Sequence, residues 1–245
     1  MYYLLGADEA GRGCVVGDLG VCIVGAQVDS FTDSPSFTNP AVQELFVHSN
    51  VIRDSKKIHR EEDRFAIADE LAFLGNNEDL WIAFREISSK QIDEQQNINY
   101  SVNEAWDQCM NEIIERILQN DSSAILEKRI RVIIDGNSYR PTPSAVSELG
   151  SCISNIIKAD ALFPCVSAAS IIAKCIHDES IDRLVRETKV QNVDLHHQLL
   201  RDYSLLTNKG YLTKQHMEAI HRLGPTIYHR HSFEPCKGWL LQHKT

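Results

Sequence analysis

The chain has 245 residues, of which 43% are hydrophobic and 24% charged, a balance that is typical of globular proteins and excludes collagen, coiled coil and general disorder. This length is enough for one large domain or two small ones with a buried core. No apolar run reaches the roughly 20 residues that span a bilayer, and Asp8 and Glu9 come too early for a signal peptide, so we expect a cytoplasmic protein with no membrane contact.

The cysteines support the same compartment. There are seven, an odd number, and no two of them form a CxxC pair. We therefore expect reduced thiols, with neither a disulfide framework nor a zinc knuckle.

The net charge of −9 argues against a nucleic-acid binder, but the charge is unevenly distributed. Residues 196–245 contain seven Lys and Arg against three Asp and Glu, and also seven of the ten histidines. A local basic face can bind phosphates whatever the total charge, although a solvated helical surface explains the same pattern. We expect partial protonation of these histidines to strengthen binding toward pH 6.

The first half of the chain predicts three strands and a helix. Apolar runs at 2–7 and 19–28 are separated by a short glycine-rich connection, which favours a hairpin. Residues 29–50 have the composition of a surface loop, with a helical turn near 42–46. Hydrophobic periodicity predicts a helix over 60–74, and alternation predicts a strand over 80–87.

The second half predicts longer helices between short strands. Residues 98–119 form an amphipathic pattern, and a strand over 129–134 ends at the turn Asp135-Gly136-Asn137. A short strand over 154–158 and a helix over 167–188 follow. Beyond them the chain is helical and loop-like, with Thr213 capping a helix that ends near Leu223. The fold class is therefore α/β, a mixed sheet flanked by helices with a helical C-terminal region.

Four acidic residues stand at the ends of predicted strands: Asp8, Glu9, Asp135 and Asp160. A carboxylate at the edge of a buried sheet is costly unless something cationic compensates it. No spacing of Cys and His suits zinc, whereas all-oxygen ligands suit Mg²⁺ or Mn²⁺. An acid after a strand is often only a turn former or a helix cap, and spacing alone does not show that the four converge.

The stretch GADEAGRG at 6–13 resembles the signature of the ribonuclease HII family. Further stretches resemble the same family in the same order: RDSKK at 53–57, QIDEQQNIN at 91–99, VIIDGN at 132–137, KAD at 158–160, SAASIIAK at 167–174, KGYLTKQH at 209–216 and HRHSF at 229–233. The resemblance runs from residue 2 to about 236. Gly-Arg-Gly after the acids, with no additional domain before the first strand, favours this family over the related ribonuclease HIII type.

The resemblance implies a ribonuclease H-like catalytic core over 1–190 and a helical substrate-binding region over 191–245, within one continuous domain. It also implies an endonuclease that cleaves the RNA strand of RNA/DNA hybrids and incises duplex DNA 5′ of an embedded ribonucleotide, leaving a 3′-hydroxyl and a 5′-phosphate. Asp8, Glu9, Asp135 and Asp160 then match the four acids that hold two divalent ions, Mg²⁺ or Mn²⁺. One ion prepares the attacking water and the other stabilises the leaving oxygen. We expect a monomer.

The same resemblance assigns substrate contacts. Gly11, Arg12 and Gly13 match the loop that reads the junction through the 2′-hydroxyl, although an ordinary tight turn has the same composition. Tyr211 matches a tyrosine that stacks on the following sugar, and a packing role is its alternative. Ser55, Lys56 and Lys57 are the expected phosphate contacts, although a lysine pair is usually only solvent-exposed.

The sequence departs from the family pattern at four positions: Cys14, Asp18, Ala159 and His177. Ala159 adds a methyl group beside Asp160 and removes freedom to adopt a positive φ, so we expect a slight shift of the metal geometry. Asp18 adds a negative charge that we expect to weaken the approach of DNA. Two alternatives stay open: a hybrid-only nuclease without junction preference, and a catalytically silent nucleic-acid-binding relative.

Overall fold

The structure is a computed structural model that describes residues 1–32, 36–48, 51–52, 58–77, 79–140 and 149–243. The chain forms two compact units. Unit 1 comprises Met1–Glu9, Val21–Arg85 and Val102–Cys175, and unit 2 comprises Ala10–Gly20, Glu86–Ser101 and Ile176–Thr245. The division near residue 190 that the resemblance implies stays a prediction.

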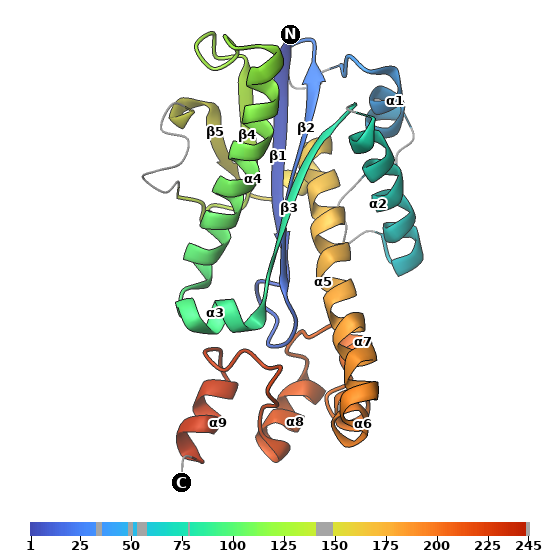
Figure 1. Ribbon diagram of the computed structural model, residues 1–245, viewed down its shortest axis with the longest axis vertical. Coiled ribbons are helices and arrows are strands. Elements are labelled where there is room, and N and C mark those ends of the chain that lie inside the picture. The colour runs from blue at the N-terminus through green and yellow to red at the C-terminus, as the bar shows by residue number, and fades with distance from the viewer. Residues whose placement is uncertain (33–35, 49–50, 53–57, 78, 141–148, 244–245) are drawn as a thin grey trace. The chain divides into compact units, whose positions relative to one another are not determined.

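Unit 1 is built on a mixed five-stranded sheet in the order β3-β2-β1-β4-β5 (Figure 1). The strands are β1 (Tyr2–Ala10), β2 (Leu19–Val28), β3 (Trp81–Ile87), β4 (Ile130–Asp135) and β5 (Ile153–Ile156). β1 pairs with β4, and β4 with β5, in parallel. β1 and β2 run in opposite directions in Figure 1, which agrees with the predicted hairpin.

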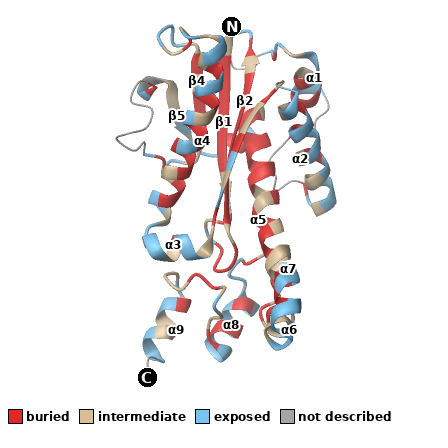
Figure 2. Ribbon diagram, in the orientation of Figure 1, coloured by how far each residue is buried: buried red, intermediate tan, exposed pale blue. Residues whose placement is uncertain are grey.

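Two long helices cover opposite faces of this sheet. A Cβ placed on Gly25 of β2 would lie 3.6 Å from Ile113 of α4 (Ile98–Asn120) and 3.3 Å from Leu5 of β1, so these three share one face. A Cβ on Gly6 would lie only 2.2 Å from the backbone nitrogen of Val166 in α5 (Pro164–Gln191). Neighbouring residues of a strand point to opposite faces, so α4 and α5 lie on different sides. Burial on both faces makes β1 and β2 almost continuously apolar (Figure 2).

The hydrophobic pattern predicted α4 better than the earlier helices. The apolar face of its amphipathic pattern is buried throughout: Val102, Ala105, Trp106, Cys109, Ile113, Ile114 and Ile117. Helix α2 (Glu61–Asn76) buries only Ile67, Leu71 and Leu74, and Ala72 is exposed. The predicted turn near 42–46 is a short helix α1 (Pro40–Gln43), which continues as a π-helical turn over Glu44–His48.

Unit 2 contains α3 (Ser89–Gln95), α6 (Val193–Arg201), α7 (Leu205–Asn208), α8 (Lys214–Leu223) and α9 (Cys236–Gln242). Its core joins Val15 and Val16 to apolar residues from α5 and from α6 to α9, among them Ile181, Leu199, Leu205 and Ile220. As predicted, Thr213 caps α8 by accepting a hydrogen bond from the His216 N–H, and Gly224 ends the helix. Helix α3 was not predicted, although Ser88 and Gln91 form a reciprocal capping box at its start.

All seven cysteines are free thiols, as expected from their number and spacing. Among the helices of the described ranges, none combines the length and the apolar character needed to cross a membrane.

Candidate active site

The four acids all belong to unit 1, and strand pairing brings two of them to neighbouring positions. Asp8 follows Ala7 in β1, and Asp135 is the last residue of β4. Ala7 pairs with Ile134 in the parallel register, so the next position on each strand places Asp8 beside Asp135. Asp160 lies in the 3-10 turn Ala159–Ala161, which follows β5. The carboxyl ends of parallel strands share one sheet edge, which is where α/β folds place ligands.

Backbone amides orient two of these carboxylates. The N–H of Ala159 donates to Oδ1 of Asp135 at 2.7 Å, which ties Asp135 to the residue next to Asp160. The N–H of Glu9 donates to Oδ1 of Asp8 at 2.7 Å. Ala159 needs no positive φ, because the positive φ of this turn, 60°, falls on Lys158 instead, and the expected slight shift of the metal geometry stays a prediction. The methyl group of Ala159 is accommodated as a buried residue of the turn.

The charges around Asp8 are unfavourable in the metal-free chain. Asp8 is 6% exposed and Asp160 is 3% exposed. Burial raises the pKa of Asp8 well above its usual range, and the negative charges of Glu9 and Asp135 raise it further, while a hydrogen bond with Ser170 opposes the shift. Glu9 and Asp135 therefore lie close enough to disfavour the ionisation of Asp8.

This arrangement fits a divalent cation by donor type and by charge. Carboxylate oxygens are the hard ligands that Mg²⁺ and Mn²⁺ prefer, and a cation would relieve the repulsion at Asp8. Over the described ranges, however, no three His, Cys, Asp or Glu side chains converge closely enough to form a ready-made metal site. The acids thus share one region of unit 1 without forming a preassembled ligand cage.

The backbone of the segment Gly11–Arg12–Gly13 is held by a buried side chain of the same unit, Arg230. The guanidinium of Arg230 is fully buried and donates to the carbonyl oxygens of Gly11 at 2.8 Å and Gly17 at 2.7 Å, with a longer contact to Arg12. Gly11 has a φ of 89°, and a Cβ there would lie 2.5 Å from Nδ1 of His177. Both the backbone conformation and the close approach therefore require glycine at this position.

His177 links this loop to the segment that carries Tyr211. Its Nδ1 lies 2.6 Å from the carbonyl oxygen of Asp18, and its Nε2 lies 2.8 Å from that of Lys209 and 3.3 Å from Sγ of Cys14. Cys14 in turn forms an isolated β-bridge with Tyr211. The ring of Tyr211 lies edge-on to His177 with centroids 5.9 Å apart, and the residue is 40% exposed.

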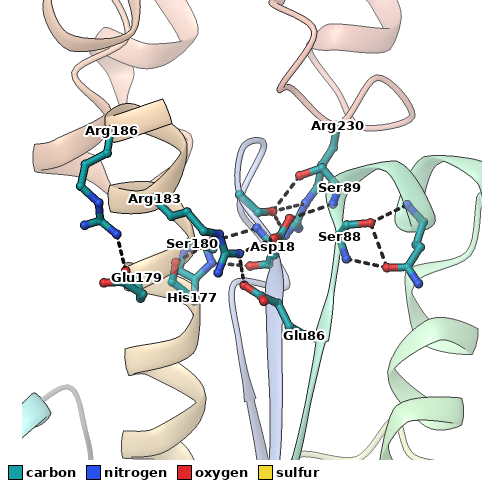
Figure 3. A network of polar contacts seen from close by, with 12 residues as sticks. Asp18, Glu86, Ser88, Ser89, His177, Glu179, Ser180, Arg183, Arg186 and Arg230 are labelled. Atoms are coloured by element: carbon teal, nitrogen blue, oxygen red, sulfur yellow. Dashed lines mark hydrogen bonds and ion pairs between the residues drawn. The ribbon is translucent and has the colours of Figure 1, made fainter. Parts of the chain in front are cut away.

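Asp18 has local partners for its negative charge, and the expected weakening of the approach of DNA stays a prediction. Its carboxylate lies 3.2 Å from Nη2 of Arg183 and accepts a hydrogen bond from the N–H of Ser89 (Figure 3). The pKa of Asp18 is raised by burial, and Arg183 and the Ser89 N–H oppose that shift. Arg183 also pairs with Glu86 at 2.5 Å. Local partners thus compensate this departure from the family pattern.

The expected phosphate contacts stay a prediction. Ser55, Lys56 and Lys57 lie outside the described residues. Lys209 forms an ion pair with Asp182 at 2.8 Å, whereas Lys214 on α8 has a well-exposed side chain. The expectation that the C-terminal histidines act together as accessible positive charges is wrong for two of them, because His216 and His229 are fully buried.

Sequence reasoning missed three contributors to this geometry. Arg230 clamps the glycine loop, His177 bridges two segments, and the Ala159 amide orients Asp135. Arg230 stands in the family-like stretch HRHSF, and His177 was noted only as a departure from the family pattern. Neither signal tells a buried residue that holds the backbone from a surface charge.

Comparison with known proteins places the whole chain in one family. The family model for ribonuclease HII matches residues 5–236. Ribonuclease HII of Helicobacter pylori (strain G27) is 31% identical over 230 residues, which cover 94% of this chain and 90% of that protein. Ribonuclease HII of Pelagibacter ubique is 28% identical over 243 residues, with 98% and 100% covered.

The fold agrees with solved structures. The ribonuclease H2 of Pyrococcus horikoshii superposes with a TM-score of 0.56 at 20% identity and covers 98% of each chain. The ribonuclease HII in a PCNA complex from Archaeoglobus fulgidus gives a TM-score of 0.60 at 21% identity, with 94% of each chain covered. The sheet order, the flanking helices and the family match lead to the same assignment: the chain belongs to the ribonuclease HII family, an enzyme family with the ribonuclease H-like α/β fold.

Proposed function

We propose that this protein is a divalent-metal-dependent endonuclease that cleaves the RNA strand of RNA/DNA hybrids and incises duplex DNA 5′ of an embedded ribonucleotide. The products are a 3′-hydroxyl and a 5′-phosphate. The observation that carries this proposal is the grouping of Asp8, Glu9 and Asp135, whose charges oppose one another in the metal-free chain. A protein that only binds nucleic acid gains nothing from carboxylates that repel phosphate, which disfavours a catalytically silent relative.

Asp8, Glu9, Asp135 and Asp160 are the residues proposed to hold two ions, Mg²⁺ or Mn²⁺. Bound divalent ions supply an activated water and stabilisation of the leaving oxygen in an in-line displacement. The chain's own contribution is orientation: the amides of Glu9 and Ala159 each fix one carboxylate oxygen. A related protein, Bst-RNase HIII, has been solved in complex with Mn²⁺, and its fold matches this chain with a TM-score of 0.62 at 17% identity.

Recognition of the ribonucleotide is assigned to unit 2. Gly11, Arg12 and Gly13 form the segment whose carbonyls are held by Arg230, so the loop is organised before substrate arrives. Backbone groups at such a glycine loop can approach a sugar closely and hydrogen-bond its 2′-hydroxyl, the group that distinguishes RNA from DNA. Tyr211 presents a partly exposed ring for stacking on the following sugar. Ser55, Lys56 and Lys57 are kept as proposed phosphate contacts.

The decisive experiment uses the full chain and a DNA duplex that carries one ribonucleotide. We expect a single cut 5′ of that ribonucleotide with Mg²⁺ or Mn²⁺, and none with EDTA. A long RNA/DNA hybrid serves as the second substrate, and Asp135→Asn serves as the inactive control. Cleavage of the hybrid alone would support the hybrid-only alternative, and tight binding without any cleavage would support the silent relative.

The role of Tyr211 is tested by comparing the same two substrates. Stacking of an aromatic ring contributes about 1–3 kcal/mol, and sugar stacking lies at the lower end of that range. Tyr211→Ala should therefore slow cleavage of the single-ribonucleotide duplex more than that of the long hybrid, where many registers are available. Tyr211→Phe, which keeps the ring, is the matched control. Equal losses on both substrates would assign Tyr211 to packing. We further propose that the enzyme acts as a cytoplasmic monomer, in keeping with its free thiols.

A further inference from the structure

Two buried histidines of unit 2 lie next to the segment that carries Tyr211. His216 of α8 and His229 are both fully buried, and their Nε2 atoms are 3.1 Å apart. The ring of Tyr203 packs against both, with centroid distances of 5.7 Å to His216 and 4.9 Å to His229. Burial excludes a direct contact of either imidazole with phosphate, so these histidines need another explanation.

The partners of the two rings fix which nitrogen of each carries the hydrogen. The backbone N–H of Thr226 can only donate, and it lies 3.0 Å from Nδ1 of His229. Nδ1 therefore holds the lone pair, and the hydrogen of His229 is on Nε2, which donates to Nε2 of His216. The hydrogen of His216 is then on Nδ1, which donates to the carbonyl oxygen of Tyr211 at 3.1 Å. One neutral tautomer of each ring satisfies every contact.

The chain of hydrogen bonds ends on a tightly held piece of backbone. The carbonyl of Tyr211 also accepts a hydrogen bond from the N–H of Thr213 at 2.9 Å. On the other side, Gly210 has a φ of 79°, and a Cβ there would lie 2.2 Å from the carbonyl oxygen of Val16. The backbone on both sides of Tyr211 is thus fixed, while its side chain remains partly exposed.

We propose that the Thr226–His229–His216 hydrogen-bond relay positions Tyr211 for ribonucleotide recognition, and that it does so only while both imidazoles are neutral. The inference rests on the proposed function for the role of Tyr211. His216 and His229 are positioning residues, because they act through the backbone of Tyr211. Protonation of His216 would place its Nε2–H against that of His229 across the 3.1 Å gap. Protonation of His229 would place its Nδ1–H against the Thr226 N–H at 3.0 Å, so either event would break the relay.

The surroundings oppose protonation. The titratable and charged groups near the pair are Tyr203, whose hydroxyl donates to the carbonyl of Gly224, His231, whose Nε2 lies 2.9 Å from the carbonyl oxygen of Thr226, and Arg230, which follows His229 in the chain. The guanidinium of Arg230 is itself a buried positive charge. Burial lowers the pKa of His216, and burial together with the neighbouring His216 and His231 lowers the pKa of His229 to about 3. Acid down to about pH 6 should therefore leave the relay intact.

The first test does not depend on activity. Nitrogen NMR of the full chain labelled at histidine distinguishes the two neutral tautomers and the imidazolium. We expect His229 protonated at Nε2 and His216 at Nδ1, with neither ring titrating between about pH 5.5 and pH 8. The opposite tautomer on either ring, or titration near the ordinary histidine pKa, would overturn the relay.

The second test compares three variants on the two substrates. His216→Phe keeps the ring size but removes both nitrogens, whereas His216→Asn keeps a donor at the position of Nδ1. His221→Asn changes an exposed histidine of the same helix and is the matched control. We expect His216→Phe to lower the ratio of single-ribonucleotide to hybrid cleavage by about tenfold, as loss of one buried hydrogen bond predicts, and His216→Asn to recover most of it.

The outcomes separate this inference from the proposed function. A folded His216→Phe protein with the wild-type ratio, or a His216→Asn protein as impaired as His216→Phe, would overturn the positioning role. If the wild-type chain does not cut at the ribonucleotide, the proposed function has failed, and the tautomer measurement alone decides whether the relay exists. The same measurement on the wild-type chain also decides the case in which His216→Phe does not fold.

Discussion

Buried charged or polar groups occur both among the acids of unit 1, at Asp8 and Asp160, and in the polar network of unit 2, but their environments are opposite. In unit 1, Asp8 is buried beside like charges from Glu9 and Asp135, and its ionised form is disfavoured. In unit 2, Arg230 is bonded to backbone carbonyls, and His229 is held neutral between a donor and an acceptor. Buried polar groups with complete hydrogen bonding stabilise a unique conformation, whereas clustered like charges need an external ion.

The two regions should therefore respond to acid with opposite signs. The pKa of Asp8 is raised, so its unfavourable charge is lost as pH falls. The pKa of His229 is lowered to about 3, so its protonation in the unfolded chain penalises the fold as pH falls. The comparison predicts that the acids of unit 1 bind a cation for the chemical step. It predicts that the polar network of unit 2 positions the segments that contact substrate.

The largest effect is expected at Asp8. Asp8→Asn should reduce cleavage about 10³-fold or more, because bound metal contributes several kcal/mol and each ~1.4 kcal/mol is a factor of ten. In the absence of metal the same variant should be more stable than the wild type at pH 7 by about 1 kcal/mol, because one disfavoured charge is gone. Cleavage assays and urea unfolding measure the two effects.

The sign of that stability change can be checked by measuring urea unfolding of both proteins as a function of pH. A folded pKa above the unfolded value makes the ionised form unfavourable, so the gain from Asp8→Asn should be present at neutral pH and vanish below the unfolded pKa of about 3.9. Asp69→Asn, at an exposed position of α2, is the control and should change neither property. Near-wild-type cleavage by a folded Asp8→Asn protein would contradict the assignment of Asp8 to the metal site.

A second, structural prediction concerns the packing that supports the acids. A Cβ on Gly6 would lie 2.2 Å from the backbone nitrogen of Val166, and backbone cannot move aside as a side chain can. Gly6→Ala should lower the free energy of unfolding by about 2–3 kcal/mol, the upper range for overpacking a core. Gly150→Ala, where a Cβ meets nothing within 4 Å, should leave it nearly unchanged. Equal urea midpoints for the two variants would mean that β1 and α5 tolerate more separation than the packing implies.

The third prediction tests the acid response of unit 2. An ordinary histidine titrates near pH 6.5 in the unfolded chain, so stability contributed by the neutral His216–His229 pair is present above that pH and lost below it, by about 1–2 kcal/mol at pH 5. Hydrogen exchange, corrected for the intrinsic effect of pH, should show α8 losing protection at pH 5 while β4 does not. Parallel loss in α8 and β4 would contradict the opposite signs.

The fold was more predictable from sequence than the site was. A continuous apolar run located β2 at its observed bounds, and the apolar face of the pattern in α4 is buried throughout, because both elements pack over their full length. Helix α2 was harder, since only three of its residues are buried and its pattern is correspondingly weak. The acids were recognisable as strand-end carboxylates, but the bond from the Ala159 amide to Asp135 depends on a tertiary turn that no local pattern encodes.

The function of the basic C-terminal fifth, residues 196–245, was also hard to predict from sequence alone. As sequence, Arg230 and seven histidines indicated a cationic face, yet Arg230, His216 and His229 are buried and serve the backbone. Burial depends on contacts between residues such as Val15 and Ile220, which are far apart in the chain. Composition therefore overestimated the charge that this region offers to a phosphate.

The smallest expected effect is on the salt dependence of duplex binding, because part of the basic charge of this region is buried. Each phosphate contact lowers the logarithm of the duplex binding constant by ~0.9 per tenfold increase in salt. From sequence, the basic candidates Lys56, Lys57, Lys209, Lys214 and Arg230 therefore predict a slope of around two to five. With Arg230 buried and Lys209 paired to Asp182, we expect the lower end of that range. Deletion of 205–245 is a poor test, because it would remove Leu205 and Ile220 from the core of unit 2.

Lys214→Gln is the sharper substitution, because Lys214 is exposed on α8 and its removal leaves the core intact. If Lys214 contacts phosphate, the slope should fall by about 0.9, one contact's worth. Lys189→Gln removes the same charge from an exposed position of α5 and should leave the slope unchanged if only local contacts matter. Equal decreases for the two variants would show that the overall charge of −9, rather than a basic face near α8, governs the salt dependence. Fluorescence anisotropy with a labelled duplex in Ca²⁺ buffer measures both slopes.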